Sequence, residues 1–426
     1  MTSGTVDRWN LRHCFYRSLY WDFLIQKGQP MIIKSKRIYM EDGLKDGFLV
    51  IEEGKIKEFI KSTDAEDVID YGNMRIIPGI FDTHNHGTCG YGLMDKGTRE
   101  TIAGYLKGCA SQGITGVFPT AGLSMISAVA DAAAENLEGA QILGIHSEGP
   151  WLNRTGEKGI KTGWPEVSID TAKQMVSDGK GLLRLVALAP EIPGIDSVIE
   201  YFLSEGITLA LAHSDANYEE AKRAYKKGFS VSTHTGNVMT GMHHRDVGGL
   251  GAALLDNEVS SEVICDGMHI CPEMLQIYFR IKKPEHFMMI SDCTPFSGAP
   301  EGSYLGFEQG MTINVSKDGF VLTDTGRLMG SSQPVLYGIS VLTEKLGMPM
   351  ETVWPMFSLN PCRKYGFDKE KGSIRAGKDA DFTVINDDYR AAATFVMGRK
   401  VYDMEEGPVF NPDFLKEWGR EEIPHE

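Results

Sequence analysis

The stretch "GIFDTHNH" (residues 79–86) carries a short apolar run directly into two histidines, His84 and His86. Four later runs end in the same way: "ILGIHSE" (142–148), "TLALAH" (208–213), "FSVSTH" (229–234) and "FMMISD" (287–292). A strand buried in a parallel sheet reads as a near-continuous apolar run, so these His, Glu and Asp residues stand at strand ends. Imidazoles and carboxylates that converge there are typical of a metal-assisted hydrolase.

The spacing of the apolar runs predicts the architecture. Three further runs, "GVFPTA" (116–121), "LLRLVALAP" (182–190) and "EVICDG" (262–267), complete a set of eight candidate strands. Their mean step of about 30 residues matches one βα unit of a (β/α)8 barrel. An open doubly wound sheet also alternates strands and helices, but it would not bring the polar ends of strands one, three, five, six and eight to one point. We therefore predict an α/β fold of the TIM-like (β/α)8 type.

The segments between these strands read as helices. Examples are "TRETIAGYLKGCASQG" (98–113), "VIEYFLSEG" (198–206) and "ANYEEAKRAYKKG" (216–228). Each finishes in glycine, at Gly113, Gly206 and Gly228, directly before the next strand. Glycine is the common residue just beyond a helix C-terminus, because it accepts a left-handed backbone.

Both ends of the chain have a different texture. Residues 31–77 and 372–404 contain short strand-like runs with glycine turns, and they pair most simply as one small β-sandwich. We predict that residues 31–77 plus 370–410 form this domain and that residues 78–369 form the barrel. Residues 1–30 would be an N-terminal extension, to which the sequence assigns no role. The "KDAD" turn (378–381) is interpreted as a structural corner.

Composition excludes several classes of function. The chain has 426 residues, 42% of them hydrophobic and 24% charged, as in ordinary globular proteins. Its net charge of −15 argues against a nucleic-acid partner, and no run approaches the roughly 20 apolar residues that span a bilayer. Seven cysteines without a CxxC pair favour a reducing compartment, so we expect a cytoplasmic protein.

Five residues are candidate metal ligands. His84 and His86 lie two apart on one strand, where their side chains point the same way. Glu148 is a carboxylate in an apolar strand end, where a metal would compensate its charge. A single histidine at a strand end is usually a hydrogen-bonded core residue, but His213 and His234 add to the other three. Ligands of this kind fit Zn²⁺, with Fe²⁺, Ni²⁺, Mn²⁺ and Co²⁺ left open.

Asp292 is the candidate catalytic group. A carboxylate beside a metal-activated water can accept its proton and deliver it to a leaving amine. The alternative is a capping aspartate before Thr294 and Pro295. His146 has the opposite strand parity to Glu148, so we interpret it as a packing residue.

The ordered motifs resemble one known family. They are "PGIFDTHNHG" (78–87), "HSEGPW" (146–151), "LAPE" (188–191), "AHSDAN" (212–217), "THTGNVM" (233–239), "HHRDVG" (243–248), "CDGMHI" (265–270), "ISDCTP" (290–295), "LMGS" (328–331) and "GSIRAGKDADFTVIN" (372–386). Together they resemble the N-acetylglucosamine-6-phosphate deacetylases of the amidohydrolase superfamily, over about residues 31–404. The resemblance implies a metal-dependent barrel that hydrolyses the acetamide of an amino-sugar phosphate, and a homodimer.

The resemblance also implies roles for individual residues. Glu148, His213 and His234 match the main metal ligands, His84 and His86 match a second metal position, and Asp292 matches the acid/base. The residues that match substrate-binding positions are Ile160, Lys161, Asn237, Val238, Arg245, His269, Arg327, Leu328 and Met329. Arg245 matches a phosphate ligand that reaches across the dimer interface; without the resemblance, a surface ion pair with Asp246 is the simpler reading.

Two segments depart from the family pattern. "KGIKTG" (158–163) places Ile160 and Lys161 where members usually carry a His or Gln near the scissile amide, and "GNVM" (236–239) replaces an aromatic-Asn-Ala-Met segment. A lysine there can stabilise a developing oxyanion or bind an anionic group. The leading hypothesis is a deacetylase of N-acetylglucosamine 6-phosphate. The alternatives are the same chemistry on N-acetylgalactosamine 6-phosphate or on an N-acyl amino acid, and a non-catalytic sugar-phosphate binding protein.

Overall fold

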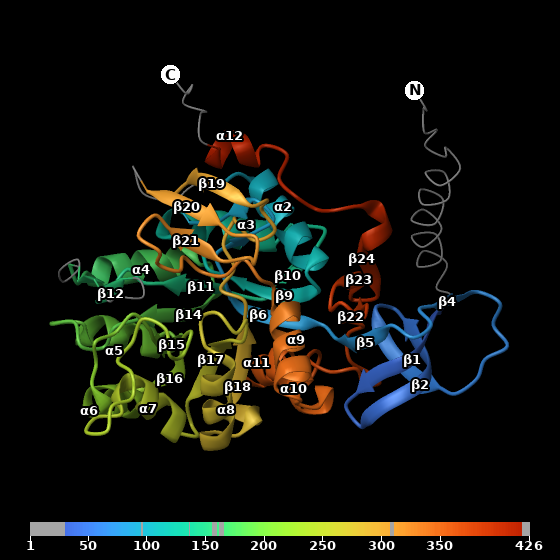
Figure 1. Cartoon of the computed structure of the whole chain (residues 1–426), viewed down its shortest axis with the longest axis horizontal. Coiled ribbons are helices and arrows are strands. Elements are labelled where there is room, and N and C mark those ends of the chain that lie inside the picture. The colour runs from blue at the N-terminus through green and yellow to red at the C-terminus, as the bar shows by residue number, and fades with distance from the viewer. Residues whose placement is uncertain are drawn as a thin grey trace.

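Eight parallel strands surround the centre of the computed structural model, which describes residues 30–94, 97–135, 137–155, 160–161, 166–306 and 311–419 (Figure 1). They are β6 (Ile80–Asn85), β9 (Ile114–Pro119), β11 (Ile145–Glu148), β14 (Leu183–Leu188), β15 (Thr208–Leu211), β16 (Phe229–Ser232), β17 (Ser260–Ile264) and β18 (Phe287–Ile290). Strands β11 to β18 pair in sequence order, and β6 pairs with β9, which also pairs with the short β10 (Gln141–Ile142). Contacts of β18 with β6 and of β9 with β11 close the ring. The predicted TIM-like barrel is confirmed.

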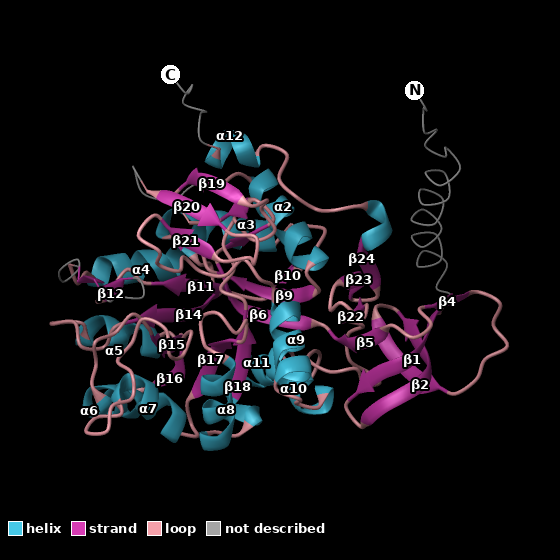
Figure 2. Cartoon of the chain, viewed as in Figure 1, coloured by secondary structure: helices cyan, strands magenta, loops and turns pink. Residues whose placement is uncertain are grey.

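Helices alternate with these strands around the barrel (Figure 2). They are α2 (Arg99–Ser111), α3 (Ile126–Ala133), α4 (Ile169–Asp178), α5 (Asp196–Ser204), α6 (Tyr218–Lys227), α7 (Gly248–Leu255), α8 (Pro272–Ile281), α9 (Val335–Ser340), α10 (Met350–Phe357) and α11 (Leu359–Tyr365). Short helical turns lie at η1 (Leu123–Met125), η2 (Pro284–His286), η3 (Val341–Lys345) and η4 (Met404–Glu406). Among the described residues, none of the helices combines the length and apolar character that crossing a bilayer requires.

Helix α6 shows how the sequence sets these boundaries. Asn217 caps its first turn by accepting from the backbone N–H of Glu220, and the Glu220 side chain accepts from the Asn217 N–H in return. Two glutamates in the first turn and two lysines in the last complement the helix dipole. Gly228 then ends the helix with φ 130°, as predicted.

Two apolar layers hold the barrel together. Alternate residues of the strands point inward, where Phe81 and Phe118 meet edge to face with ring centroids 5.0 Å apart. The other residues, such as Val117 and Leu209, point outward and pack under the helices. The candidate metal ligands stand at the strand ends, above this inner cluster.

Strands from both ends of the chain form one sheet beside the barrel, with the blue N-terminal and red C-terminal strands side by side (Figure 1). They are β1 (Met31–Met40), β2 (Gly43–Glu52), β3 (Lys55–Ile60), β4 (Val68–Asp70), β5 (Arg75–Pro78), β22 (Phe382–Ile385), β23 (Ala391–Val396) and β24 (Arg399–Asp403). The order is β24-β23-β22-β5-β1-β2-β3, and β4 pairs with β1. The expected β-domain built from both termini is thus present as a single hydrogen-bonded sheet.

The "KDAD" corner is held by ion pairs. The ammonium of Lys371 lies 2.9 Å from Asp379 and 2.7 Å from Asp381, and Lys55 lies 2.8 Å from Asp379. These contacts tie the start of β22 to β3, which agrees with a structural role for this turn.

The structure contains elements that the sequence did not predict. A three-stranded sheet, β19 (Gly302–Leu305), β20 (Thr312–Val315) and β21 (Val321–Thr323), is inserted between β18 and α9, and α12 (Phe414–Trp418) packs against it. Two hairpins, β7 (Gly87–Thr88) with β8 (Tyr91–Gly92) and β12 (Arg154–Thr155) with β13 (Ile160–Lys161), follow β6 and β11. The predicted N-terminal extension lies outside the described residues, apart from Pro30.

Candidate metal centre and active site

Three of the candidate site residues share an unusual backbone. His213 (φ 46°), His234 (φ 33°) and Asp292 (φ 51°) all adopt the left-handed conformation at the point where a barrel strand ends. Non-glycine residues rarely take this conformation, and those that do are concentrated at functional sites. Here the turn directs each side chain over the carboxyl end of the barrel.

Glu148, His213 and His234 form one group of ligating atoms. The Glu148 Oε1 lies 3.1 Å from the His213 Nε2 and 2.8 Å from the His234 Nε2. All three residues are buried or nearly so, and their ligating atoms lie within 4.8 Å of one another. They come from the ends of β11, β15 and β16, so three separate strands build the group.

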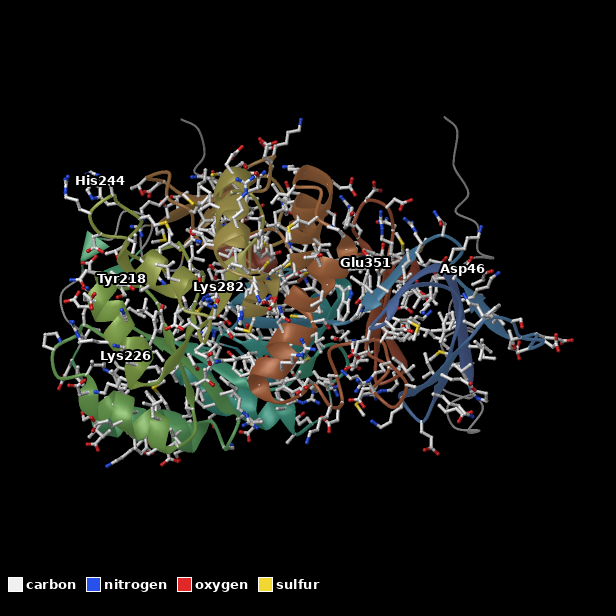
Figure 3. The ribbon with its side chains drawn as sticks, turned by 90° about the horizontal axis from the view of Figure 1, so that it is seen from below. Asp46, Tyr218, Lys226, His244, Lys282 and Glu351 are labelled. Carbon is white, nitrogen blue, oxygen red and sulfur yellow. The ribbon has the colours of Figure 1, made fainter. Side chains whose placement is uncertain are left out.

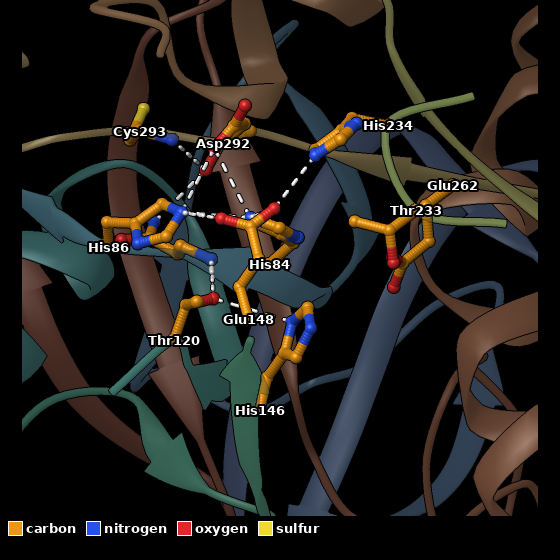
Figure 4. Close-up of polar contacts among 12 residues, drawn as sticks. His84, His86, Thr120, His146, Glu148, Thr233, His234, Glu262, Asp292 and Cys293 are labelled. Carbon is orange, nitrogen blue, oxygen red and sulfur yellow. Dashed lines mark hydrogen bonds and ion pairs between the residues drawn. The ribbon is translucent and has the colours of Figure 1, made fainter. Parts of the chain in front are cut away.

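His84, His86 and Asp292 form a second group (Figure 4). The Nε2 atoms of the two histidines are 3.0 Å apart, and they lie 3.3 and 3.5 Å from the Asp292 Oδ1. Glu148 joins the groups, because its Oε2 is 3.3 Å from the His86 Nε2. The structure therefore brings all six candidate residues to one place.

The composition of this centre fits a divalent metal. Four imidazole nitrogens point at one another and at two carboxylates, and neutral imidazoles and carboxylates are the ligands that Zn²⁺ and similar cations prefer. The carboxylates raise the pKa of His84 to about 9 against the opposing effect of its burial. The field that favours a positive charge on this imidazole also favours a bound cation.

Asp292 is ionised in this field. Burial on its own would raise the pKa of the carboxyl, but the charges of His84 and His86 and a hydrogen bond from His84 outweigh burial and lower the pKa to about 2. An ionised Asp292 can accept a proton. The backbone N–H of Thr294 donates to the Ser331 carbonyl oxygen (3.2 Å), whereas the Asp292 Oδ1 faces His84 and His86, which differs from the capping aspartate of the alternative interpretation.

Buried acids support the ligands from below. Asp82 accepts from the Ser291 hydroxyl (2.6 Å) and from the Asn85 amide (3.1 Å), which links β6 to the residue before Asp292. Glu262 on β17 accepts from the hydroxyls of Thr83 and Thr233, the residues directly before His84 and His234. Burial raises the pKa of Glu262 to about 7.

Glu191 supports the loop after β15. Its Oε1 accepts from the Asn153 amide (2.8 Å) and from the Asp215 N–H (2.6 Å), and its Oε2 accepts from the Ser214 hydroxyl (2.7 Å). Asn153 in turn donates its N–H to the carbonyl of His213 (2.9 Å). The left-handed backbone at His213 is therefore held through its own carbonyl oxygen and through the two residues that follow it.

Sequence reasoning did not assign these three acids to the site. Asp82 and Glu262 carry the same signal that identified Glu148, which is a charged residue inside an apolar strand. Glu191 lies in the "LAPE" segment (188–191), beyond the end of its strand, where the sequence pattern does not mark it as part of the site. His146 is buried under His84, with its Nδ1 3.1 Å from the Thr83 carbonyl oxygen, so it packs as interpreted.

Six of the predicted substrate-binding residues lie on segments that adjoin the barrel rim. Asn237 and Val238 follow His234 directly, and the Asn237 N–H donates to the His234 carbonyl (2.8 Å). His269 follows β17, with its Nδ1 2.8 Å from the buried Asp266. Arg327, Leu328 and Met329 lie on the strand-like return from the inserted sheet, which reaches Asp292 through Ser331.

Arg245 is not brought against the metal centre within this chain. It lies in an exposed loop beyond β16, and Figure 3 shows its neighbour His244 at the edge of the molecule. Its guanidinium contacts the His244 ring (2.5 Å), whereas Asp246 accepts from the backbone N–H of Tyr218 and Gly248. Ile160 and Lys161 form β13, and their side chains lie outside the described part of the chain.

A cavity opens beside the metal centre. Its volume is about 140 Å³, and its walls include His86, Met94, Ala121, Leu123, Glu148 and Pro150. These residues come from the loops that follow β6, β9 and β11. A reactant held at the centre therefore has open space on this side.

The fold and the site together define a hydrolase with a metal centre at the carboxyl rim of a (β/α)8 barrel. Residues 75–401 match the model of the amidohydrolase family. The chain is 31% identical to the N-acetylglucosamine-6-phosphate deacetylase of Vibrio furnissii, over 85% of this chain and 93% of the relative. It is 29% identical to the N-acetylgalactosamine-6-phosphate deacetylase of Escherichia coli O157:H7, over 86% and 98%. The chain belongs to the amidohydrolase family, in the branch that contains the N-acetylglucosamine-6-phosphate deacetylases.

Solved structures agree with this assignment. A variant of the N-acetyl-D-glucosamine-6-phosphate deacetylase of Mycobacterium smegmatis, in complex with N-acetyl-D-glucosamine-6-phosphate, superposes with a TM-score of 0.79 at 25% identity. It is covered over its whole length by 88% of this chain. The N-acetylglucosamine-6-phosphate deacetylase of Thermotoga maritima superposes with a TM-score of 0.73 at 27% identity, with 88% of this chain and 100% of that chain covered.

Proposed function

We propose that this protein hydrolyses the acetamide of N-acetylglucosamine 6-phosphate to glucosamine 6-phosphate and acetate. The observation that carries the proposal is the convergence of four imidazoles and Glu148 on Asp292, in a chain whose relatives bear this activity in their names. The metal ligands are proposed to be Glu148, His213 and His234, with His84 and His86 at a second position. One ion or two would be held, most suitably Zn²⁺.

The roles of the chain's own groups follow from their positions. A divalent ion held by these residues would supply polarisation of the scissile carbonyl and activation of water. Asp292 accepts the proton of the attacking water, because its carboxyl is ionised and lies at the centre. It then delivers this proton to the amine nitrogen as the carbon–nitrogen bond breaks. Acetate and a free amino sugar result.

The phosphate needs a cation, because the chain carries a net charge of −15. Arg245 suits this role, since its planar fork matches phosphate oxygens. Its exposed position in this chain supports a homodimer in which Arg245 serves the partner's site. Asn237, Val238, His269 and the segment Arg327–Met329 are proposed to line the sugar pocket.

The setting of the enzyme is part of the proposal. We place it in the cytoplasm, in keeping with the six described cysteines, which are all free thiols. Residues 78–369 would be the catalytic domain, and residues 31–77 with 370–410 the supporting domain.

The test is acetate release by zinc-loaded protein from N-acetylglucosamine 6-phosphate, with unphosphorylated N-acetylglucosamine alongside. Fast release from the phosphate ester alone is expected, and Arg245→Ala should then reduce kcat/KM for that ester. If neither compound releases acetate, the proposed substrate is wrong.

A second candidate keeps the chemistry and changes the sugar. Lys161 stands where the family usually has His or Gln, and one relative is named as an N-acetylgalactosamine-6-phosphate deacetylase. Comparison of the two sugar phosphates in the wild type and in Lys161→His distinguishes these candidates. An unchanged ranking removes Lys161 from specificity. A protein that binds the phosphate esters tightly but releases no acetate over hours would be the non-catalytic binding protein.

A further inference from the structure

The 140 Å³ cavity lies on a definite side of the metal centre. The pairing order of the strands puts β9 four positions from β16 in either direction around the ring of eight. The cavity is built around the residues that follow β9, whereas Asn237 and Val238 follow β16 and His269 follows β17. The cavity and these three residues therefore lie on opposite sides of the centre, and the segment Arg327–Met329 reaches the centre between them, beside β18.

The geometry of an amide gives this opposition a chemical meaning. The amide group is planar, and its carbonyl carbon carries the nitrogen on one side and the first carbon of the acyl chain on the other. With the carbonyl at the metal centre and the sugar toward β16 and β17, the acyl group points toward β9. The acyl chain beyond the carbonyl carbon then enters the cavity.

The cavity is larger than an acetyl group requires. The volume of about 140 Å³ includes the space beside the ligands His86 and Glu148, and the remainder still exceeds one methyl group. Three of its walls, Met94, Ala121 and Leu123, are apolar side chains. Apolar walls favour the burial of additional methylene groups.

Two of these walls are in a position to set the length of the acyl group. Leu123 begins η1, lines the cavity and is 43% exposed. Met94 lies with its Sδ 3.0 Å from the His86 Nδ1. Gly122 lets the two loops touch, since a Cβ at this position would lie 1.5 Å from the Met94 carbonyl oxygen.

We propose that this cavity is the acyl subsite, that Leu123 and Met94 limit the acyl length, and that the enzyme hydrolyses N-acyl amino-sugar phosphates longer than acetyl. The proposal rests on the proposed function, because it takes the sugar phosphate as the other half of the substrate. The bond broken is the same amide bond, and a carboxylate of the longer chain leaves in place of acetate.

The experiment is a series of N-acetyl, N-propionyl, N-butyryl and N-hexanoyl amides of glucosamine 6-phosphate, compared by kcat/KM with zinc-loaded protein. Each added methylene up to butyryl is expected to change kcat/KM by no more than about fourfold. Leu123→Trp fills the cavity and should lower the butyryl-to-acetyl ratio of kcat/KM at least tenfold. Met94→Ala should raise kcat/KM for the hexanoyl amide relative to that for the acetyl amide.

Leu44→Trp is the matched control, since Leu44 is similarly exposed (46%) but lies on β2 of the terminal sheet. It should leave the ranking unchanged. As a second readout, calorimetry on the inactive Asp292→Asn variant should show similar dissociation constants for the acetyl and butyryl amides. In the double variant Asp292→Asn with Leu123→Trp, the dissociation constant of the butyryl amide alone should rise.

A fall in kcat/KM of more than a hundredfold from the acetyl to the propionyl amide in the wild type overturns the inference. A Leu123→Trp variant in which the ratios of kcat/KM among the amides equal those of the wild type also overturns it. In both cases acetate release persists, and the proposed function stands. If no member of the series is hydrolysed, the proposed function fails and the inference fails with it.

Discussion

Asp292 combines a lowered pKa with a position beside His84 and His86, and both properties come from its neighbours. His84 and His86 keep its carboxylate ionised, and Asp82 holds the preceding residue Ser291 in place. The aspartate can therefore accept a proton at neutral pH without losing its orientation.

We expect Asp292→Asn to lower kcat by roughly a thousandfold, because an amide can neither accept nor deliver the proton. The bound metal, measured by mass spectrometry of the purified protein, should remain, since Glu148, His213 and His234 are unchanged. A variant with more than a tenth of the wild-type acetate release would remove Asp292 from the acid/base role.

Glu191 offers a second residue-level test. Its carboxylate accepts from Asn153, Ser214 and Asp215, which together fix the backbone around His213. Glu191→Ala should weaken zinc binding by about 10- to 100-fold, as the loss of outer groups does at other metal sites. Chelator competition measures this affinity.

Glu200→Ala is the control for this measurement. Glu200 is an exposed glutamate on α5, 3.6 Å from Lys227, and its loss should leave zinc affinity unchanged. Equal effects of the two variants would show that Glu191 does not act through His213.

The sequence alone was sufficient to find the residues at the rim. Each of them stands where an apolar strand ends, and a charge in that position is conspicuous. The support beneath the rim was not found, because the partners of Asp82 and Glu262 lie on other strands. Contacts such as Ser291 to Asp82, which are 209 residues apart, depend on barrel closure and leave no local pattern.

At the scale of single elements, α8 is fastened to α7 by one buried lysine. Lys282, which is labelled in Figure 3, follows α8 directly. Its ammonium donates to the carbonyl oxygens of Ala253 (2.6 Å), Asp256 (2.8 Å) and Val259 (2.6 Å). These carbonyls belong to the last turn of α7 and the loop that follows. A 1% exposed lysine thus satisfies backbone groups that water does not reach.

We expect Lys282→Met to lower the free energy of unfolding by about 3 kcal/mol, because it leaves buried carbonyls without donors. Urea unfolding followed by circular dichroism measures the change. Lys283→Met is the matched control, since Lys283 is an exposed neighbour whose ion pair with Glu285 is 3.8 Å long. Coincident unfolding curves for the two variants would contradict the role given to Lys282.

Elements differed in how well the sequence predicted them. The helices ending at Gly113, Gly206 and Gly228 were predicted because each has a helical pattern and a glycine stop. The inserted sheet β19–β21 was not, since its short strands mix polar and apolar residues, whereas an equally short barrel strand such as β18 is a continuous apolar run. Short strands of mixed polarity carry too few alternating positions to be distinguished from loops.

At the scale of the whole molecule, the C-terminal segment crosses back to the active-site rim. Asn411 donates its N–H to the carbonyl of Cys89 (2.8 Å) and its amide to the carbonyl of Gly90 (2.9 Å). Both carbonyls belong to the β7–β8 hairpin, which follows His86 directly. Figure 1 shows this segment running from β24 to α12, above the inserted sheet.

Asn411→Ala should therefore loosen the hairpin. The amides of Cys89 and Gly90 are expected to exchange with deuterium about tenfold faster, and kcat should fall several-fold as His86 loses its support. Hydrogen-exchange mass spectrometry of peptides over residues 86–93 measures the first effect. Asn314→Ala, on β20 of the inserted sheet, is the control, and equal exchange in both variants would show that Asn411 does not restrain the hairpin.

The terminal sheet has a consequence for how the protein is made. Lys55 and Asp379, which pair across it, are separated by 324 residues. At a synthesis rate of roughly 5–20 residues per second, the early strands leave the ribosome about 15 to 65 seconds before their partners. Over that interval the apolar faces of β1, β2 and β5 have no covering strand from the other end of the chain. The terminal sheet of this enzyme is thus begun early in synthesis and completed only after the whole barrel has been made.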